Sequence, residues 1–530
     1  SEILKQSMPR IANARGWANP DTWHSATIAM LGGLLGDDDA VDLAIEGPLG
    51  YKSILEILQD DRLWPEPIGY GMGYVRCVLS IIAEVARHTG REDLYRWETR
   101  QGVSYKNMFD GFLEMLFADG RLANHGDCGN GPRLWNGEGR SSGIFEMAYR
   151  VYRDPRYAWI LAQSPQRDTR DEVFWGYSAL THGVPLGDVQ PPDATGKIWR
   201  CYGSALVRGD ESDSYWNSNA PAVYMRTGQP HGHGHSDTAN ILLNAYGRNL
   251  YPDISVGWSY QSRIDPKTGK DVNPSPFTKL RISHNTVSMD CTEPKIVNLP
   301  HLGDVRETGP MKVVILRVAQ GERLRRTIGV TDQYVFDWMC VGNIVEPNMD
   351  TEHTFDYHLY GLGIPELSGV NDVAPYNSLN EEYGLGPIDV RSSASDNLWI
   401  RPGQAGATDS AWQAIMREER PLDPQNPRGV RIHMLGESGT QVITGNVPNY
   451  VSGEGWDATK SENAHPGRLG LLLVRRQAVI HTEYLAVHQP FCGSSPAPLH
   501  FSRQDNTLQV QGEDFCDTIN LPAVTCRRDY

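Results

Sequence analysis

Histidines at alternate positions form the densest group of potentially reactive side chains. The segment from Gln229 to Asp237 contains His231, His233 and His235, separated by glycines. On an extended strand, residues two apart point to the same face, so this spacing would place the three imidazoles on one side. The glycines would leave room for a ligand to approach the backbone. A polar surface loop that happens to contain histidines is the structural alternative.

Asp253 and His284 extend this group, since each lies next to strand-like sequence further along the chain. Together with His235 they offer two imidazoles and a carboxylate, a set of donors that suits Zn²⁺ with water or another group as the fourth ligand. Taken singly, an aspartate or a histidine is more often an ordinary hydrogen-bonded residue. The three are therefore interpreted together, as a predicted site for one zinc ion.

Further candidates lie upstream, and each is a weak signal when taken alone. Asn124 and His125 follow a predicted helix and open a glycine-rich loop that includes Asp127. An asparagine beside a histidine at a helix end can donate hydrogen bonds to one carboxylate, although a loop or capping role is more common. Tyr177 would more often be a packing residue with its hydroxyl in water.

The elements that must position these side chains change in type along the chain. In the first third, apolar residues recur three and four apart, which predicts helices over Trp23–Leu35, Ala40–Leu58, Met72–His88, Tyr105–Phe117 and Ile144–Tyr152. From about Lys197 onward, short alternating runs predict antiparallel strands, with 322–341 and 469–488 each expected to be a strand pair. The region 363–410 is expected to be mostly long loops.

The chain of 530 residues is too long for one ordinary core, so two large domains are expected. The predicted linker is 186–196, rich in proline, glycine and aspartate. The prediction is an α+β multidomain protein, with 1–190 helical and 191–530 an antiparallel β domain that has a C-terminal β extension.

Composition restricts the partners. The formal net charge is −16 and the pI about 5.5, which argues against nucleic acid as the main partner. Arginine outnumbers lysine, and the guanidinium fork suits carboxylate or sulfate. No apolar run reaches the roughly 18 to 20 residues that span a bilayer, so no membrane insertion is expected. The eight cysteines are expected to be mainly buried thiols, with a Cys516–Cys526 disulfide as the less favoured alternative.

The order of these motifs resembles the heparinase II/III-like polysaccharide lyases. The resemblance consists of Asn124–His125, a tyrosine about 50 residues later, the pair His233 and His235, an aspartate 18 residues further on, and His284 followed by Asn-Thr-Val. It covers roughly residues 60 to 360. Only about 120 residues precede Asn124, fewer than the toroid of this family usually supplies, and the loop containing Asp127 matches no single substrate subgroup.

This resemblance implies an incomplete (α/α) toroid followed by an antiparallel β-sandwich, with the active site between them. It assigns catalytic roles to Asn124, His125 and His233, which would neutralise a uronate carboxylate, and to Tyr177, the proton donor and for some substrates also the base. Tyr260 is a further candidate base. The zinc ligands would be His235, Asp253 and His284, and the zinc would be mainly structural. Substrate contacts are expected from Tyr70, Arg133 and Trp135.

The expected activity is therefore β-elimination on a uronic-acid-containing glycan, which leaves a 4,5-unsaturated uronate at the new non-reducing end. The partner would be an acidic polysaccharide or oligosaccharide, and the location secreted or periplasmic. The proton at C5 of a uronate is weakly acidic because the adjacent carboxylate already carries negative charge. Donors to that carboxylate would stabilise the charge that develops, as an oxyanion hole does.

Three other functions remain open from the sequence. A toroidal glycoside hydrolase would need two carboxylates flanking the bond, and Glu66, Asp127 and Glu138 lie in loops where they could serve. A non-catalytic glycan-binding protein would use Trp64, Tyr70 and Trp135 as stacking platforms, but gives no reason for the histidines. A cupin-like metal enzyme would explain the paired histidines, but not the helical first third.

Overall fold

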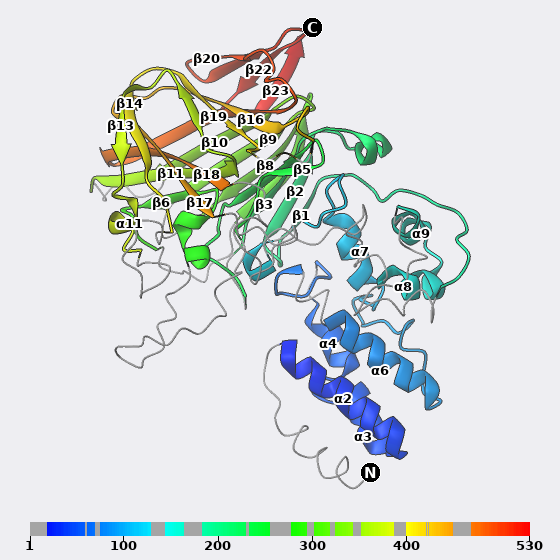
Figure 1. The fold of residues 1–530 in the computed structure, drawn as a ribbon. Helices are drawn as coiled ribbons and strands as arrows, with labels where there is room; N and C mark the ends of the chain where they lie inside the picture. Colours follow the sequence, from blue (N-terminus) through cyan, green and yellow to red (C-terminus); the bar gives the residue numbers. More distant parts are fainter. Residues whose placement is uncertain are drawn as a thin grey trace, which may run out of the picture.

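The computed structural model is an α+β protein whose helices precede its antiparallel sheets (Figure 1). It describes residues 19–58, 61–68, 75–123, 125–128, 144–163, 183–228, 233–254, 277–293, 302–318, 324–342, 351–385, 399–419, 421, 423–448 and 468–529. Along these ranges, no helix combines the length and the apolar character that crossing a membrane requires. The α+β class predicted from the sequence is confirmed.

Apart from one short helix further along, the α-helices of the described residues lie in the first third of the chain, as predicted. Those described before residue 163 are α2 (Asn19–Leu35), α3 (Asp38–Glu46), α4 (Tyr51–Ile57), α6 (Arg76–His88), α7 (Asn107–Glu114), α8 (Ile144–Tyr152) and α9 (Pro155–Ala162). The single helix predicted over 40–58 is wrong, because the chain leaves the helical conformation at Gly47 and resumes it at α4. The proline that follows Gly47 disfavours helical backbone there.

A five-stranded sheet lies between the helices and the remaining strands. It consists of β1 (Lys197–Trp199), β2 (Ser204–Arg208), β3 (Ala222–Arg226), β4 (Ile241–Ala245) and β5 (Arg248–Tyr251), paired in that order. Side chains on one face, such as Tyr224, pack in the core of the helices, and those on the other, such as Val223, pack in the core of the other sheets. Because both faces are covered, β2, β3 and β4 are buried at every position.

Two larger sheets form the core that lies on the side of the five-stranded sheet away from the helices. The eight-stranded sheet has the order β12 (Glu366–Ser368), β15 (Trp412–Arg417), β16 (Arg428–Met434), β19 (His481–Cys492), β10 (Val335–Gly342), β9 (Leu324–Val330), β8 (Met311–Arg317) and β7 (Leu302–Thr308). The six-stranded sheet has the order β13 (Asn371–Tyr376), β14 (Gly403–Thr408), β17 (Thr440–Pro448), β18 (Arg468–Val479), β11 (His353–Leu362) and β6 (Val287–Met289).

Two strand predictions need correction. The strands over 469–488 do not pair with each other, because β18 joins the six-stranded sheet and β19 the eight-stranded one. The described residues of 363–410 are not mostly loop, since they contain β12, β13, β14 and the short helix α11 (Leu379–Glu382). Its strand β13 is exposed along nearly its whole length, so it lacks the apolar alternation by which strands are recognised.

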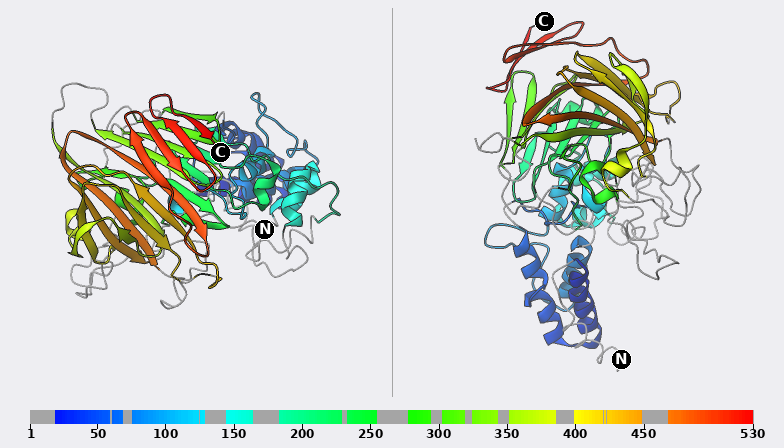
Figure 2. Two further views of the ribbon diagram at one scale, coloured as in Figure 1. Left: turned by 90° about the horizontal axis from the view of Figure 1, so that it is seen from above. Right: turned by 90° about the vertical axis from the view of Figure 1, so that its left-hand side faces the viewer.

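The chain ends in a four-stranded sheet, β20 (His500–Gln504), β21 (Thr507–Gln511), β22 (Cys516–Asn520) and β23 (Thr525–Asp529). It packs on the outer face of the eight-stranded sheet through its own core, at the end of the molecule opposite helices α2 and α3 (Figure 2). Cys516 and Cys526 form no disulfide, since they lie opposite Asp529 and Ile519 in the strand register. Cys201 and Cys492 are exposed, against the prediction of buried thiols.

Candidate functional site

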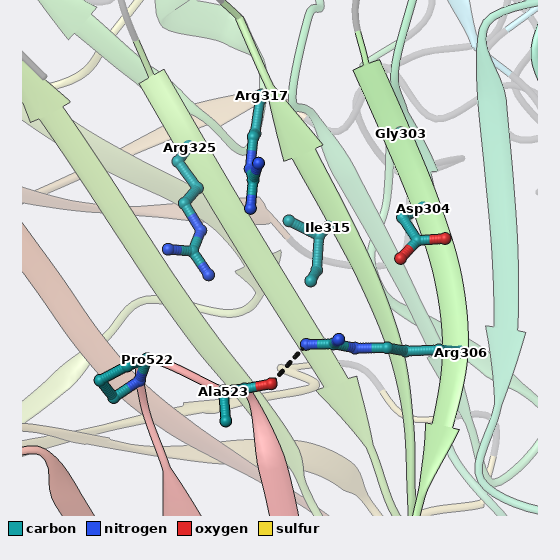
Figure 3. Close-up of a pocket in the computed structure, with 8 residues that line it drawn as sticks. All are labelled: Gly303, Asp304, Arg306, Ile315, Arg317, Arg325, Pro522 and Ala523. Carbon is teal, nitrogen blue, oxygen red and sulfur yellow. Dashed lines mark hydrogen bonds between the residues drawn. The ribbon is translucent and has the colours of Figure 1, made fainter. Parts of the chain in front are cut away.

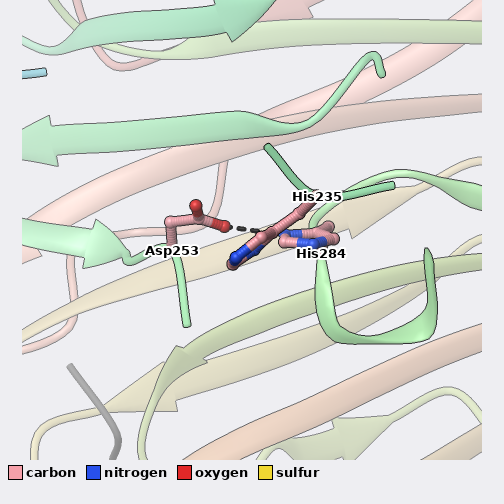
Figure 4. Close-up of side chains that lie close together, drawn as sticks. All are labelled: His235, Asp253 and His284. Atoms are coloured by element: carbon pink, nitrogen blue, oxygen red, sulfur yellow. Dashed lines mark hydrogen bonds and ion pairs between the residues drawn. The ribbon is translucent and has the colours of Figure 1, made fainter. Parts of the chain in front are cut away.

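His235, Asp253 and His284 converge from three separate segments of the chain (Figure 4). His235 lies between β3 and β4, Asp253 follows β5 by two residues, and His284 ends a short 3-10 helix ahead of β6. All three are buried, and one potential ligand atom from each lies within 4.8 Å of the others. The arrangement brings together two imidazoles and a carboxylate, as the sequence predicted.

Neighbouring groups hold this trio in position. The Nδ1 atom of His284 lies 2.8 Å from Oδ1 of Asp253, and Nδ2 of Asn240 donates to the same oxygen at 2.9 Å. Burial lowers the pKa of His284, but the charge of Asp253 and the hydrogen bond to it outweigh burial, so the pKa is raised. Polar partners of this kind orient metal ligands in proteins.

The trio fits a divalent cation. Nδ1 of His235 and Nε2 of His284 are buried and have no hydrogen-bond partner among the described residues. Buried polar atoms are normally satisfied, and an imidazole nitrogen left without a hydrogen bond is available as a metal ligand. Asp237 adds a second buried carboxylate, with Nε of Arg226 at 3.7 Å from its Oδ1. Nitrogen and oxygen donors without a thiolate suit zinc among the common metals.

Asp127 connects this trio to His233. Its Oδ2 lies 2.8 Å from Nδ1 of His233, and its Oδ1 lies 2.9 Å from Nε2 of His235. Its backbone N–H donates to the carbonyl oxygen of His233 at 2.9 Å, and Nζ of Lys279 lies 3.4 Å from Oδ1. The carboxylate is fully buried, so one side chain from the helical part of the chain fixes both histidines of the β part.

The backbone around Asp127 is tightly constrained. Gly126 has φ +63°, and a Cβ atom at this position would lie 2.5 Å from the carbonyl oxygen of His233. His233 itself has φ +63°, a conformation that costs a non-glycine residue energy and that concentrates at functional sites. The segment containing His233 and His235 is therefore not the strand that the alternate spacing predicted. Both imidazoles nevertheless reach the same carboxylate.

His125 lies two residues before Asp127 and is buried against the five-stranded sheet. Its Nδ1 atom lies 2.7 Å from the hydroxyl oxygen of Tyr224, and the two rings are stacked. The Tyr224 hydroxyl also lies 2.5 Å from Oγ of Ser204. Burial raises the pKa of Tyr224, although Arg226 and Ser204 act in the opposite direction. Tyr224 therefore stays a neutral phenol that fixes the imidazole of His125.

A carboxylate also approaches the outer side of His233. Oε1 of Glu66 lies 3.9 Å from Nε2 of His233, and its Oε2 accepts a hydrogen bond of 2.8 Å from the indole N–H of Trp64. His233 is more accessible than His235, with 27 % of its side chain exposed. The exposed edge of this imidazole is where a substrate group could reach it.

The structure brings together four of the predicted site residues, His233, His235, Asp253 and His284. His125 lies two residues before Asp127 and contacts Tyr224. The other predicted residues, with their proposed roles, lie outside the described residues, namely Asn124, Tyr177, Tyr260, Tyr70, Arg133 and Trp135. Tyr224 was not predicted as a site residue, and Asp127 was named only as a candidate carboxylate of the glycoside hydrolase alternative. Tyr224 lies in a buried strand and gives no signal, whereas Asp127 was placed in the loop that His125 opens, but its contacts with His233 and His235 were not predicted.

Similarity to solved structures was found along nearly the whole chain. A heparan sulfate lyase from Pedobacter heparinus matches at 12 % identity with a TM-score of 0.62, covering 98 % of this chain and 68 % of its own. A heparinase III matches at 12 % identity with a TM-score of 0.60, covering 97 % and 67 %.

The chain has the fold of the heparinase III-type polysaccharide lyases. A second heparinase III agrees at 11 % identity with a TM-score of 0.59, covering 98 % and 66 %. The chain thus spans about two thirds of the length of the lyases it matches. No protein-family model and no curated protein sequence matches it. The predicted resemblance is confirmed in the fold.

Proposed function

We propose that the protein is a polysaccharide lyase that cleaves a uronic-acid-containing glycan by β-elimination. The observation that carries the proposal is the buried network in which Asp127 joins His233 to His235, with His125 on the same short segment. The heparinase III-type fold supports it, because the named structures with this fold are lyases. The product would be a 4,5-unsaturated uronate.

The proposed mechanism begins at the uronate carboxylate. His233, with its accessible imidazole edge, and His125 would, with Asn124, donate to this carboxylate and stabilise the charge that develops when the C5 proton leaves. Either Tyr177 or Tyr260 would accept that proton as the base. Tyr177 would then donate a proton to the C4 oxygen of the leaving chain. Tyr70, Arg133 and Trp135 would contact the glycan.

A bound zinc ion held by His235, Asp253 and His284 would supply local positive charge and a fixed geometry, and its role would be structural. Asp127 would couple the orientation of His233 to that of the zinc ligand His235, because its carboxylate contacts both imidazoles. His233 would then be held in its left-handed backbone conformation at the position that the substrate carboxylate requires.

The proposed domain organisation is that of the heparinase III-type fold. The helices before residue 163 would be the last part of an incomplete (α/α) toroid, and the sheets an antiparallel sandwich, with the division into 1–190 and 191–530. The acidic-glycan substrate would also place the protein outside the cell or in the periplasm.

The glycoside hydrolase alternative has less support. Both oxygens of Asp127 contact imidazoles, and its side chain is fully buried, so it lacks the access that a catalytic acid or base needs. Glu138 lies outside the described residues.

The direct test of activity is a panel of uronic polysaccharides, followed by ultraviolet absorbance and product sizing. Elimination creates a conjugated double bond that absorbs, and hydrolysis does not. We expect absorbance to rise with at least one member of the panel. Shortened products without absorbance would instead indicate a hydrolase, and binding without shortening a glycan-binding protein.

A further inference from the structure

A second pocket gathers cationic side chains and shares no residue with the candidate site. It has a volume of about 350 Å³ and lies where the turn between β22 and β23 meets the outer face of the eight-stranded sheet (Figure 3). Among the residues that line it are Arg306, Arg317, Arg325, Asp304, Ile315 and Ala523.

Strand register places the three arginines on one face. Arg306, Arg317 and Arg325 lie on the adjacent strands β7, β8 and β9. Arg317 is directly opposite Arg325, and Ile315 is directly opposite Asp304. Opposite residues of an antiparallel pair point to the same side of the sheet. The guanidinium groups therefore lie around Ile315 on this face, as Figure 3 shows.

Two of the arginines are held in place by uncharged partners. The guanidinium of Arg306 donates to the carbonyl oxygen of Ala523 at 2.6 Å, and that of Arg325 lies 4.7 Å from the centre of the Trp338 ring. Nε of Arg325 is buried and has no hydrogen-bond partner among the described residues. These contacts orient the guanidinium groups without neutralising them.

The pocket has an excess of positive charge. Within the described part of the chain, none of the three arginines forms an ion pair, whereas exposed arginines elsewhere do, such as Arg87 with Glu84 and Arg527 with Asp529. Burial lowers the pKa of Arg325, and the nearby charges of Arg317 and Arg306 lower it further, against an opposite effect of Cys340. Asp304 is the single carboxylate that lines the pocket. This is unusual in a chain of net charge −16.

We propose that this pocket binds a sulfate or carboxylate group of an acidic glycan chain at a position separate from the catalytic site. Guanidinium groups match both anions through paired N–H donors, and an anion would relieve their mutual repulsion. The choice of a glycan as the source of the anion rests on the proposed lyase function. The pocket would hold a long chain on the protein while another part of it occupies the catalytic site.

The test compares binding of a heparan sulfate oligosaccharide, of an unsulfated oligouronate and of inorganic sulfate, by calorimetry at constant ionic strength. The full chain carries Tyr177→Phe, which should suppress cleavage, together with either Arg317→Gln and Arg325→Gln or the control pair Arg87→Gln and Arg527→Gln, whose arginines are exposed. Loss of two charge-assisted contacts should weaken binding of at least one oligosaccharide about tenfold. The control pair should bind as the Tyr177→Phe protein alone does.

Three results would overturn the proposal. The first is unchanged oligosaccharide binding by the pocket variant, and the second is an equal loss in the control pair, which would indicate general charge attraction. The third is binding of oligosaccharide no tighter than that of inorganic sulfate, which would make the pocket a site for a free anion. Because binding is measured without turnover, failure of the lyase function would leave these results interpretable. Melting temperatures show whether each variant is folded.

Discussion

At the scale of single residues, Asp127 determines how the site is built. One buried carboxylate contacts two imidazoles through its two oxygens, so its charge and its geometry both matter. The sequence predicted His233 and His235 from their spacing, but it could not assign their partner. Asp127 is more than 100 positions away from both histidines, and a single aspartate in a glycine-rich loop has no local pattern that marks it.

The substitution Asp127→Asn tests this role. The asparagine side chain would keep the shape but remove the charge, and its amide NH₂ cannot accept a hydrogen bond from an imidazole. We expect turnover to fall about 100-fold with little change in KM, because a preorganised donor would be misplaced. Unfolding free energy should drop by about 1 to 3 kcal/mol.

The matched control is Asp290→Asn, which alters another aspartate–histidine contact, 2.8 Å from Nδ1 of His353, at a partly exposed position. This variant should retain turnover and stability. If Asp127→Asn were destabilised but turned over normally, Asp127 would be a folding residue and not a positioning residue.

At the scale of elements, the short segment around Gly126 belongs to the helical part and contacts the β part. Helices in the helical part and strands in the β part were predictable from periodicity, because amphipathic helices and buried strands leave clear patterns. The contact between the Gly126 segment and the His233 segment was not predictable from the sequence, since it depends on left-handed backbone at both residues. The sequence suggested a strand at His233, and tertiary packing imposes a turn.

Gly126→Ala tests this contact. A methyl group there meets the carbonyl oxygen of His233 at 2.5 Å, so the loop must move, and Asp127 with it. Gly102→Ala is the control, because Gly102 has φ +71° but no atom within 4 Å of the added carbon. Backbone strain alone should cost each variant about 1 to 2 kcal/mol of unfolding free energy.

Turnover separates the two variants. It should fall at least tenfold for Gly126→Ala and stay unchanged for Gly102→Ala. Equal activity in the two proteins would show that the approach of these segments does not position the catalytic groups.

The proposed zinc site is a second feature at this scale, since a bound ion would hold together three segments around β3, β5 and β6. Metal analysis should find about one zinc per chain, and removal of the metal should lower the melting temperature, because binding to the folded state stabilises it. At a free zinc concentration 100 times Kd, the stabilisation would be about 2.7 kcal/mol.

Variants show which residues hold the ion. His235→Ala should lose the zinc and the shift in melting temperature on chelation, whereas His481→Ala, at an exposed position, should keep both. Full zinc occupancy in His235→Ala would contradict the assignment of the ligands.

At the scale of the whole molecule, the fold places the helices on one side of the five-stranded sheet and two large sheets on the other. The sequence predicted this order of helical and β parts. It did not predict which strands share a sheet, because β18 and β19 are consecutive in the chain but pair with distant strands. Strand type is a local property, and sheet membership depends on packing between segments far apart in sequence.

The measurement that tests the central claim most directly is the mass of the products from a uronate glycan digested by the unmodified protein and by Tyr177→Phe. Elimination leaves the new non-reducing end one water lighter than hydrolysis does, and it absorbs in the ultraviolet. We expect that product from the unmodified protein, and a rate lowered about 10²- to 10⁴-fold in Tyr177→Phe, since the ring remains but the proton donor is lost. Products carrying the added water would contradict the lyase account.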